Sequence, residues 1–320
     1  MDFHSLISNL TNPTLLFFAL GTFAILVKSD LEIPESSSKF ISLYLLFAIG
    51  FKGGQELAHS GFSPEIVYPL LFGLGLATVI PLYTFFILKL KMSVSDAGAV
   101  AAAYGSVSAV TFVAAVSFLE SQKLVFGGHM VAVMALMEAP AIIAGVMLLM
   151  RYDEGARSKG NLTKTIRHSF TNGSVLMIFG SLVIGFIADT KQAEGIRPFT
   201  TDIFKGFLAI FLLEMGMVTA KRFATFKKYG WFATAFALIV PMINGSLVAA
   251  LSGLFIHGIG NRFIFAILAA SASYIAVPAA MRLAAPKADP GLYIPMALGI
   301  TFPFNITIGM PLYYLIVTST

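Results

Sequence analysis

Apolar runs of about 18 or more residues recur along the whole chain, and each is long enough to cross the hydrocarbon core of a bilayer. Apolar residues make up 57% of the sequence and charged residues only 12%, whereas a soluble domain carries about 25% charged residues. Inside lipid, every backbone N–H and C=O group needs a partner within the protein, so such runs fold as helices. The sequence therefore predicts an all-α polytopic membrane protein.

Ten membrane-spanning helices are predicted, and the basic residues give their orientation. The predicted spans cover residues 13–29, 37–56, 65–90, 94–119, 129–151, 172–189, 202–221, 230–256, 261–284 and 291–317. With the N-terminus outside, the outer loops and flanks hold only Lys52, Lys123, Lys191, Arg197, Lys205 and Arg262, and the rest of the 21 lysines and arginines lie inside. The positive-inside rule then places both termini outside and residues 152–171 in a cytoplasmic linker.

The charge and the reactive residues exclude several classes of function. The topological bias accounts for the net charge of +5, so no nucleic-acid partner is needed to explain it. The chain has no cysteine, which rules out disulfides and thiolate chemistry, and its five histidines do not have metal-ligand spacing. We therefore expect neither an enzyme active site nor a bound cofactor.

The two halves of the sequence, 1–151 and 172–320, resemble one another in four places that follow in order. Gly21 aligns with Gly180, Gly50 with Gly216, 106–110 with 273–277, and 137–140 with 300–303. Because each half has an odd number of spans, the second half must lie upside down relative to the first. The sequence thus predicts two inverted five-helix repeats, an architecture of many secondary transporters.

The fourth and ninth spans each contain small and hydroxylated residues in mid-span. We expect the fourth to break near Tyr104 to Ser106 and the ninth near Ser271 to Tyr274, with new half-helices starting near Ser106 and Ala276. A broken span exposes N–H groups that suit an anion and C=O groups that suit a hard cation. Inversion would bring both breaks together near the midplane. The small and hydroxylated residues of the two breaks include Gly105, Ser106, Ser108, Ser271 and Ser273. The alternative is that these small residues pack intact helices together.

Two acidic residues fall inside predicted spans, where an ionisable side chain indicates a function. Glu138 is the candidate ligand of a sodium ion, with Ser108, Thr111, Thr301 and Asn305 as neutral partners. Its alternative is a protonated carboxyl bonded to a backbone carbonyl. Glu214 is interpreted as a coupling group, a gate or a partner of Lys221.

At these residues the sequence resembles the cyanobacterial-type sodium-dependent bicarbonate transporters and their wider bacterial permease family. The resemblance lies in the ordered segments 31–36, 106–111, 118–123, 137–141, 213–217, 269–273 with Pro278 and Arg282, and 288–294. The sequence departs from the best-known members at Glu138 and Tyr274, where those have aspartates, at Val110, where they have a serine, and at Glu214, where they have an apolar residue.

The resemblance implies ten spans, with a gate domain from spans 1, 2, 6 and 7 and a core domain from spans 3–5 and 8–10. It implies a homotrimer in the bacterial plasma membrane, elevator-like motion and a PII-like protein that docks on the cytoplasmic face of some relatives. The function it implies is sodium-driven uptake of bicarbonate. The resemblance implies that bicarbonate is held between the broken spans, with Gly105, Ser106, Ser108, Ser271 and Ser273 as the candidate substrate-binding residues.

Two other functions remain open at this point. One is a proton- or sodium-coupled transporter of a small organic carboxylate, with Glu138 or Glu214 as the proton carrier. The other is a membrane receptor or scaffold that has this fold and does not transport.

Overall fold

The computed structural model describes residues 13–60, 64–153, 167, 171, 173–226 and 230–320. Within these residues the secondary structure is helical and contains no strand. Among the described residues, six helical stretches are long and apolar enough to cross a membrane, and three shorter apolar helices accompany them. The expected linker 152–171 and the first twelve residues lie almost entirely outside the described residues.

The described residues of the first half form six helices. They are α2 (Pro13–Leu26), α3 (Glu35–Ser60), α4 (Pro64–Leu88), α5 (Val94–Gly105), α6 (Ala109–Ser121) and α7 (His129–Tyr152). Each predicted span has its helical counterpart here, and the fourth span is divided into α5 and α6. The helix α3 is as long as its neighbours but less apolar, because it carries Lys39, Lys52 and Glu56.

The second half begins with α10 (Gly173–Ile187) and is more irregular. It continues through α11 (Thr190–Ala193), η1 (Glu194–Ile196), η2 (Pro198–Asp202), α12 (Phe204–Phe226), α13 (Gly230–Leu251), η4 (Ser252–Leu254), α14 (Ile259–Ala270) and α15 (Ala276–Ala284). The predicted last span is not one regular helix. It consists of α16 (Pro290–Pro295), η5 (Met296–Thr301), α17 (Phe302–Phe304), η6 (Asn305–Gly309) and α18 (Met310–Ser319), and η5 and η6 are π-helical. Pro295 and Pro303 have no N–H to donate, which disturbs the regular ladder of hydrogen bonds.

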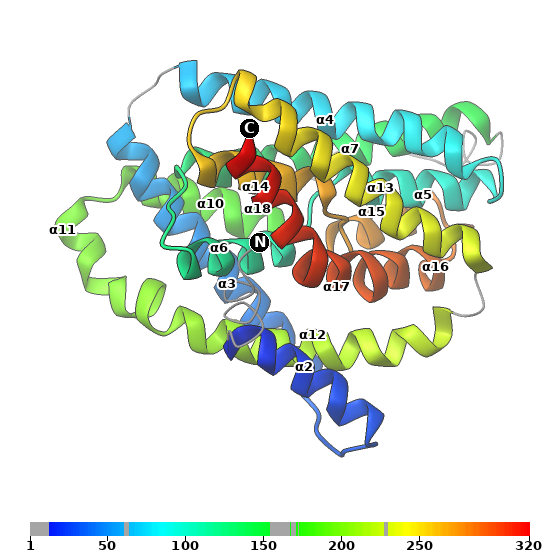
Figure 1. Ribbon diagram of the computed structural model, residues 1–320, viewed down its shortest axis with the longest axis horizontal. Helices are drawn as coiled ribbons and strands as arrows, with labels where there is room; N and C mark the ends of the chain where they lie inside the picture. Colours follow the sequence, from blue (N-terminus) through cyan, green and yellow to red (C-terminus); the bar gives the residue numbers. More distant parts are fainter. Residues whose placement is uncertain (1–12, 61–63, 154–166, 168–170, 172, 227–229) are drawn as a thin grey trace.

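The helices pack in two groups. The helix α2 lies along α12 and α3 lies along α10, while α4, α5 and α7 pack together and α13 packs on α14. Figure 1 shows α4, α7 and α13 along the top of the view and α2 and α12 along the bottom, with α6, α14 and α18 between them. The interrupted helices therefore lie inside the bundle.

The half-helices that precede the interruptions are the most enclosed parts of the fold. From Ala97 to Gly105, every residue of α5 is buried, and from Arg262 to Ala270, every residue of α14 is buried. A helix that is apolar on all sides can lie against lipid or inside the protein, and these two half-helices lie inside the protein. The alanine-rich sequence of α5 fits this position, because small side chains allow neighbouring helices to approach closely.

Close helix contacts also correct one of the sequence matches. The Cα of Gly216 lies directly against the carbonyl of Phe18, so any side chain there would collide with α2. Gly50 has the corresponding contact with Ile178 and Ser181 on α10. Gly180, however, has open space beside it, whereas Gly21 lies against Leu213. In the contact of α10 with α3, Ser181 therefore takes the position that Gly21 takes in the contact of α2 with α12. The match of Gly21 with Gly180 was wrong by one residue.

Candidate functional site

The two interruptions lie against each other and are joined by hydrogen bonds. The backbone N–H of Ser108 donates to the side-chain oxygen of Ser271 over 3.0 Å, and the N–H of Ser273 donates to the carbonyl of Ala103 over 2.8 Å. Each interruption thus provides hydrogen-bond partners for polar groups of the other. The expectation that both helices break and that the breaks meet is confirmed for the described residues.

The first interruption lies slightly later than expected. The helix α5 continues to Gly105, and Ser106 to Ser108 are extended before α6 begins at Ala109. The reason is local: the side chain of Ser108 accepts a hydrogen bond from the N–H of Thr111 at 3.2 Å and so caps the start of α6. The half-helix α6 was predicted to start near Ser106. It starts three residues later, at Ala109.

The second half-helix begins where the sequence predicted, at Ala276, but without a cap. Ile275 occupies the cap position and offers no side-chain acceptor to the first turn of α15. Pro278 lies in that first turn, where its missing N–H has no cost. The remaining N–H groups of this turn are therefore a site of partial positive charge to which an anion can bind.

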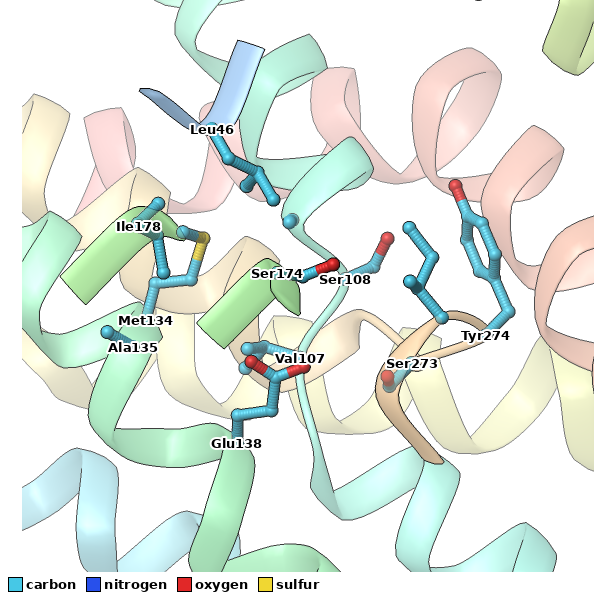
Figure 2. A pocket seen from close by; sticks show the side chains of 12 residues that line it. Leu46, Val107, Ser108, Met134, Ala135, Glu138, Ser174, Ile178, Ser273 and Tyr274 are labelled. Carbon is cyan, nitrogen blue, oxygen red and sulfur yellow. The ribbon is translucent and has the colours of Figure 1, made fainter. Parts of the chain in front are cut away.

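A pocket lies between the two interruptions, α7 and the helix pair α3–α10. Figure 2 shows Glu138 of α7 pointing into it, with Ser108 and Ser273 on the neighbouring walls and Tyr274 at one end. It is lined by Leu46, Val107, Ser108, Ala109, Met134, Ala135, Glu138, Ser174, Ile178, Ser273, Tyr274 and Ile275. The pocket therefore brings together Glu138, the start of α6 and the segment that leads into α15.

The charges in this pocket are unusual, since it contains one carboxyl group and no basic side chain. Within the described residues, Glu138 forms no ion pair, and no cluster of three or more acidic or histidine side chains could hold a metal ion. A carboxylate buried in this way is costly unless a cation or a proton accompanies it. Any anion must be held by N–H groups, hydroxyls and the helix ends.

Of the five predicted substrate-binding residues, only Ser108 and Ser273 line the pocket. Gly105 ends α5, and a side chain there would collide with the ring of Pro81. The hydroxyl of Ser271 accepts from Ser108 and donates to the carbonyl of Leu268 over 2.9 Å. Ser106 is 1% exposed, and its hydroxyl has no partner in the described part of the chain. Ser106 is thus a buried polar group beside the pocket wall.

The predicted neutral partners of Glu138, apart from Ser108, lie elsewhere. The hydroxyl of Thr301 donates to the carbonyl of Ala237 over 2.8 Å and is 2.7 Å from the hydroxyl of Tyr104. The side-chain amide of Asn305 donates to the carbonyl of Ala270 over 2.8 Å. Thr111 is buried in the first turn of α6. The structure therefore brings Glu138 together with Ser108 and places Thr301 and Asn305 in a second buried polar cluster.

A much wider cavity adjoins the pocket and shares Ser174, Tyr274 and Ile275 with it. It has an open volume of about 1310 Å³ and extends to Glu35 and Lys39 at the start of α3. We call this cavity the vestibule. Sequence reasoning did not identify Ser174 as a wall residue of the pocket, because its place depends on how α10 packs against α3. A serine at the start of an apolar helix is the only sequence signal it gives.

The chain matches one family of known proteins. No curated protein matches the chain significantly. The sequence model of the Na⁺-dependent bicarbonate transporter superfamily matches residues 13–318, which include both interruptions, Glu138 and Glu214. On this match, which covers nearly the whole chain, the protein belongs to the Na⁺-dependent bicarbonate transporter superfamily.

Proposed function

We propose that the protein is a secondary transporter that imports bicarbonate together with sodium, and that both bind in the pocket at Glu138. The observation that carries this proposal is the shared position of Glu138 and the two helix starts in one pocket. The uncapped start of α15 and the serines of the walls suit a small oxyanion. The carboxylate of Glu138 suits sodium, a hard cation that prefers oxygen ligands.

The two charges explain why transport would be coupled. An anion near Glu138 is repelled by the carboxylate unless a cation is bound there, because the pocket has no basic side chain. Sodium therefore favours binding of the anion, and the anion favours binding of sodium to the same degree. Ser108 is within the same pocket and can supply an oxygen to the cation. Thr111, Thr301 and Asn305 stay candidates for this site only if the surrounding helices rearrange.

The proposed architecture is ten spans in two inverted repeats. Its support is that equivalent helices have equivalent neighbours: α2 packs on α12 as α10 packs on α3, and α4 packs on α5 as α13 packs on α14. The helices α2, α3, α10 and α12 would form the gate domain, and the remaining helices would form the core domain. We further propose a homotrimer in the bacterial plasma membrane with both termini outside, and an elevator-like movement of the core.

The vestibule supports an inward-facing conformation. It reaches the starts of α3 and α10, which the predicted topology places on the cytoplasmic side. On the opposite side, Lys205 of α12 forms a 3.0 Å ion pair with Glu120 of α6. This pair spans the proposed gate and core where the outer entrance would open. A PII-like regulator would have to dock on the vestibule side.

Uptake of labelled bicarbonate into proteoliposomes tests the proposal. Uptake should be several-fold faster with an inward sodium gradient than with equal sodium on both sides, at the same pH and membrane potential. Glu138→Gln should remove the difference, whereas Glu194→Gln, at an exposed ion pair with Arg197, should retain it. Equal uptake with and without the gradient would refute sodium coupling. A steep dependence on pH alone would favour the proton-coupled alternative.

A further inference from the structure

The second carboxyl group inside the membrane, Glu214, takes no part in the pocket at Glu138. It lies on α12 with 8% of its surface exposed, and its Oε2 atom has no hydrogen-bond partner among the described residues. The side chain of Ser38 on α3 lies beside it. No ion pair to Glu214 occurs in the described part of the chain, so its expected pairing with Lys221 is absent there. This buried carboxyl group thus has no charged partner among the described residues.

Glu214 lies where the proposed gate and core helices touch. The next residue, Met215, receives a contact of 3.7 Å at its sulfur from the hydroxyl of Tyr274, which belongs to the second interruption. One turn further along α12, the hydroxyl of Thr219 donates to the carbonyl of Leu298 in η5 over 3.2 Å. Tyr274 is also close enough for the charge of Glu214 to act on it. Any change at Glu214 therefore acts on the contact between α12 and the pocket wall.

A path from water leads to this carboxyl group. Ser38, which lies beside Glu214, lines the vestibule, as do Phe211 and Met215 on α12. Glu214 itself lies behind this wall. The carboxyl group is therefore buried but close to the water of the vestibule, from which a proton can reach it past Ser38.

The surroundings decide which positive species Glu214 can bind. A metal cation needs several oxygen ligands, yet the polar side chains near the carboxyl group among the described residues are Ser38 and Tyr274, and no acidic cluster exists there. A proton needs a single oxygen lone pair and removes the cost of a buried charge. We propose that Glu214 is a proton-binding site at the contact of α12 with the second interruption, and that it gains and loses its proton during the transport cycle.

Charged or titratable groups also occur on α12 and on the elements packed against it. On the packed elements they are Glu35, Lys39, Tyr44, Lys52, Glu56 and His59 of α3, Asp202 of η2, Tyr293 of α16 and Tyr274, and on α12 itself they are Lys205, Lys221 and Arg222. Of these, Tyr274 contacts Met215, and the ring of Tyr44 packs on Phe207. The helix α2 and the π-helix η5 contain none. Glu214, in the middle of α12, is therefore the group whose protonation affects the contact between α12 and the second interruption.

The link to transport rests on the proposed function. While the core is seated on α12, Glu214 is buried and holds its proton. When the core moves and Tyr274 leaves Met215, water reaches the carboxyl group, and it releases the proton to the vestibule. The reverse movement requires the proton to return, so the pH on the vestibule side sets how readily the contact closes again. By linkage, the conformation and the proton affect each other equally.

Infrared spectroscopy of the purified protein tests the proton site without any transport. A protonated carboxyl group gives a C=O stretching band that a carboxylate does not. Glu214→Gln should remove one such band at neutral pH, and Glu35→Gln should leave it unchanged, because Glu35 is exposed in the same vestibule. If the spectra of wild type and Glu214→Gln are identical in this region, the proton site does not exist.

Transport then tests the coupling. In proteoliposomes with the protein oriented vestibule inwards, the sodium-driven uptake rate of wild type should change at least about threefold as internal pH is varied around neutrality, and Glu214→Gln should respond much less. The Glu35→Gln variant should follow wild type. An unchanged pH response in Glu214→Gln would overturn the coupling. If no variant shows sodium-driven uptake while the infrared band is still lost, the proposed function fails and the proton site stands.

Discussion

The backbone N–H of Ser108 donates a 3.0 Å hydrogen bond to the side-chain oxygen of Ser271, a residue 163 positions away in the sequence. Both residues are buried, and both lie in interrupted helices. An N–H group that lacks an intrahelical partner in a membrane protein must find one elsewhere. A side chain from the other half of the chain therefore stabilises the interruption between α5 and α6.

Replacing Ser271 tests this contact directly. Ser271→Ala should lower the free energy of unfolding by about 1–3 kcal/mol, because the N–H of Ser108 loses its acceptor in a buried place. Ser271→Thr keeps the hydroxyl and should lose less. Thermal unfolding in detergent measures the change. Ser319→Ala is the matched control, since Ser319 is exposed and bonds only within α18. Equal stability of Ser271→Ala and wild type would show that the contact is unimportant.

The second polar cluster should behave as a structural unit. Tyr104 and Thr301 share a 2.7 Å hydrogen bond, and both are buried. In a double-mutant cycle, Tyr104→Phe and Thr301→Val should show a coupling energy of about 0.5–3 kcal/mol. Thr307 is exposed and bonds only to the preceding turn. Tyr104→Phe and Thr307→Val should therefore be additive. Additive effects for the Tyr104–Thr301 pair would contradict the unit.

Arg262 is a buried cation in the second half of the chain, and its hydrogen bonds explain why it can lie there. Its guanidinium donates to the carbonyls of Ala249 and Val317 at 3.0 and 3.2 Å, at the ends of α13 and α18. Positive charge at helix C-termini is favourable. Arg262→Met should lower stability in a thermal unfolding assay by at least about 2 kcal/mol, because buried carbonyls lose charged donors.

The control for Arg262 is Arg197, which forms an exposed pair with Glu194. Arg197→Met should change stability by less than about 1 kcal/mol. The prediction fails if the two arginine variants unfold at the same temperature.

A crevice lined by Val116 and Glu120, among others, lies on the side opposite the vestibule, and we call it the outer crevice. The ion pair between Lys205 and Glu120 should hold it closed. Because the chain has no cysteine, a single cysteine at Val116, which lines that crevice and is 7% exposed, reports its opening. Glu120→Gln should raise the rate of labelling by a maleimide by up to about fivefold, the effect of a pair worth up to about 1 kcal/mol. Glu194→Gln should leave the rate unchanged. Slower or equal labelling in Glu120→Gln would argue against a closing role.

Much of the fold could be predicted because membrane helices obey strong local rules. Apolar length gave the helices, and the small and hydroxylated residues with Pro278 gave both interruptions. The sequence places the start of α6 near Ser106, and only the bond from the N–H of Thr111 identifies Ser108 as the cap. The π-helical stretches of the last span could not be predicted, since the effect of Pro303 on its neighbours depends on packing.

The site was harder to predict than the fold. Depth in the membrane singled out Glu138, and the pocket confirms that it faces the interruptions. The partners could not be assigned, because a threonine or asparagine in a helix serves a ligand or a carbonyl equally well. Thr301 and Asn305 bond the carbonyls of Ala237 and Ala270, which are distant in sequence. The symmetry of the repeats alone did not reveal these contacts.

The central claim is that Glu138 and the helix starts form one pocket in which sodium and bicarbonate favour each other. Isothermal titration calorimetry on the purified protein tests it most directly, with bicarbonate titrated at low and at saturating sodium. We expect bicarbonate to bind at least about fivefold more tightly with sodium present, sodium to gain the same factor from bicarbonate, and Glu138→Gln to lose both effects. If wild type binds bicarbonate equally tightly with and without sodium, the coupling through Glu138 is wrong.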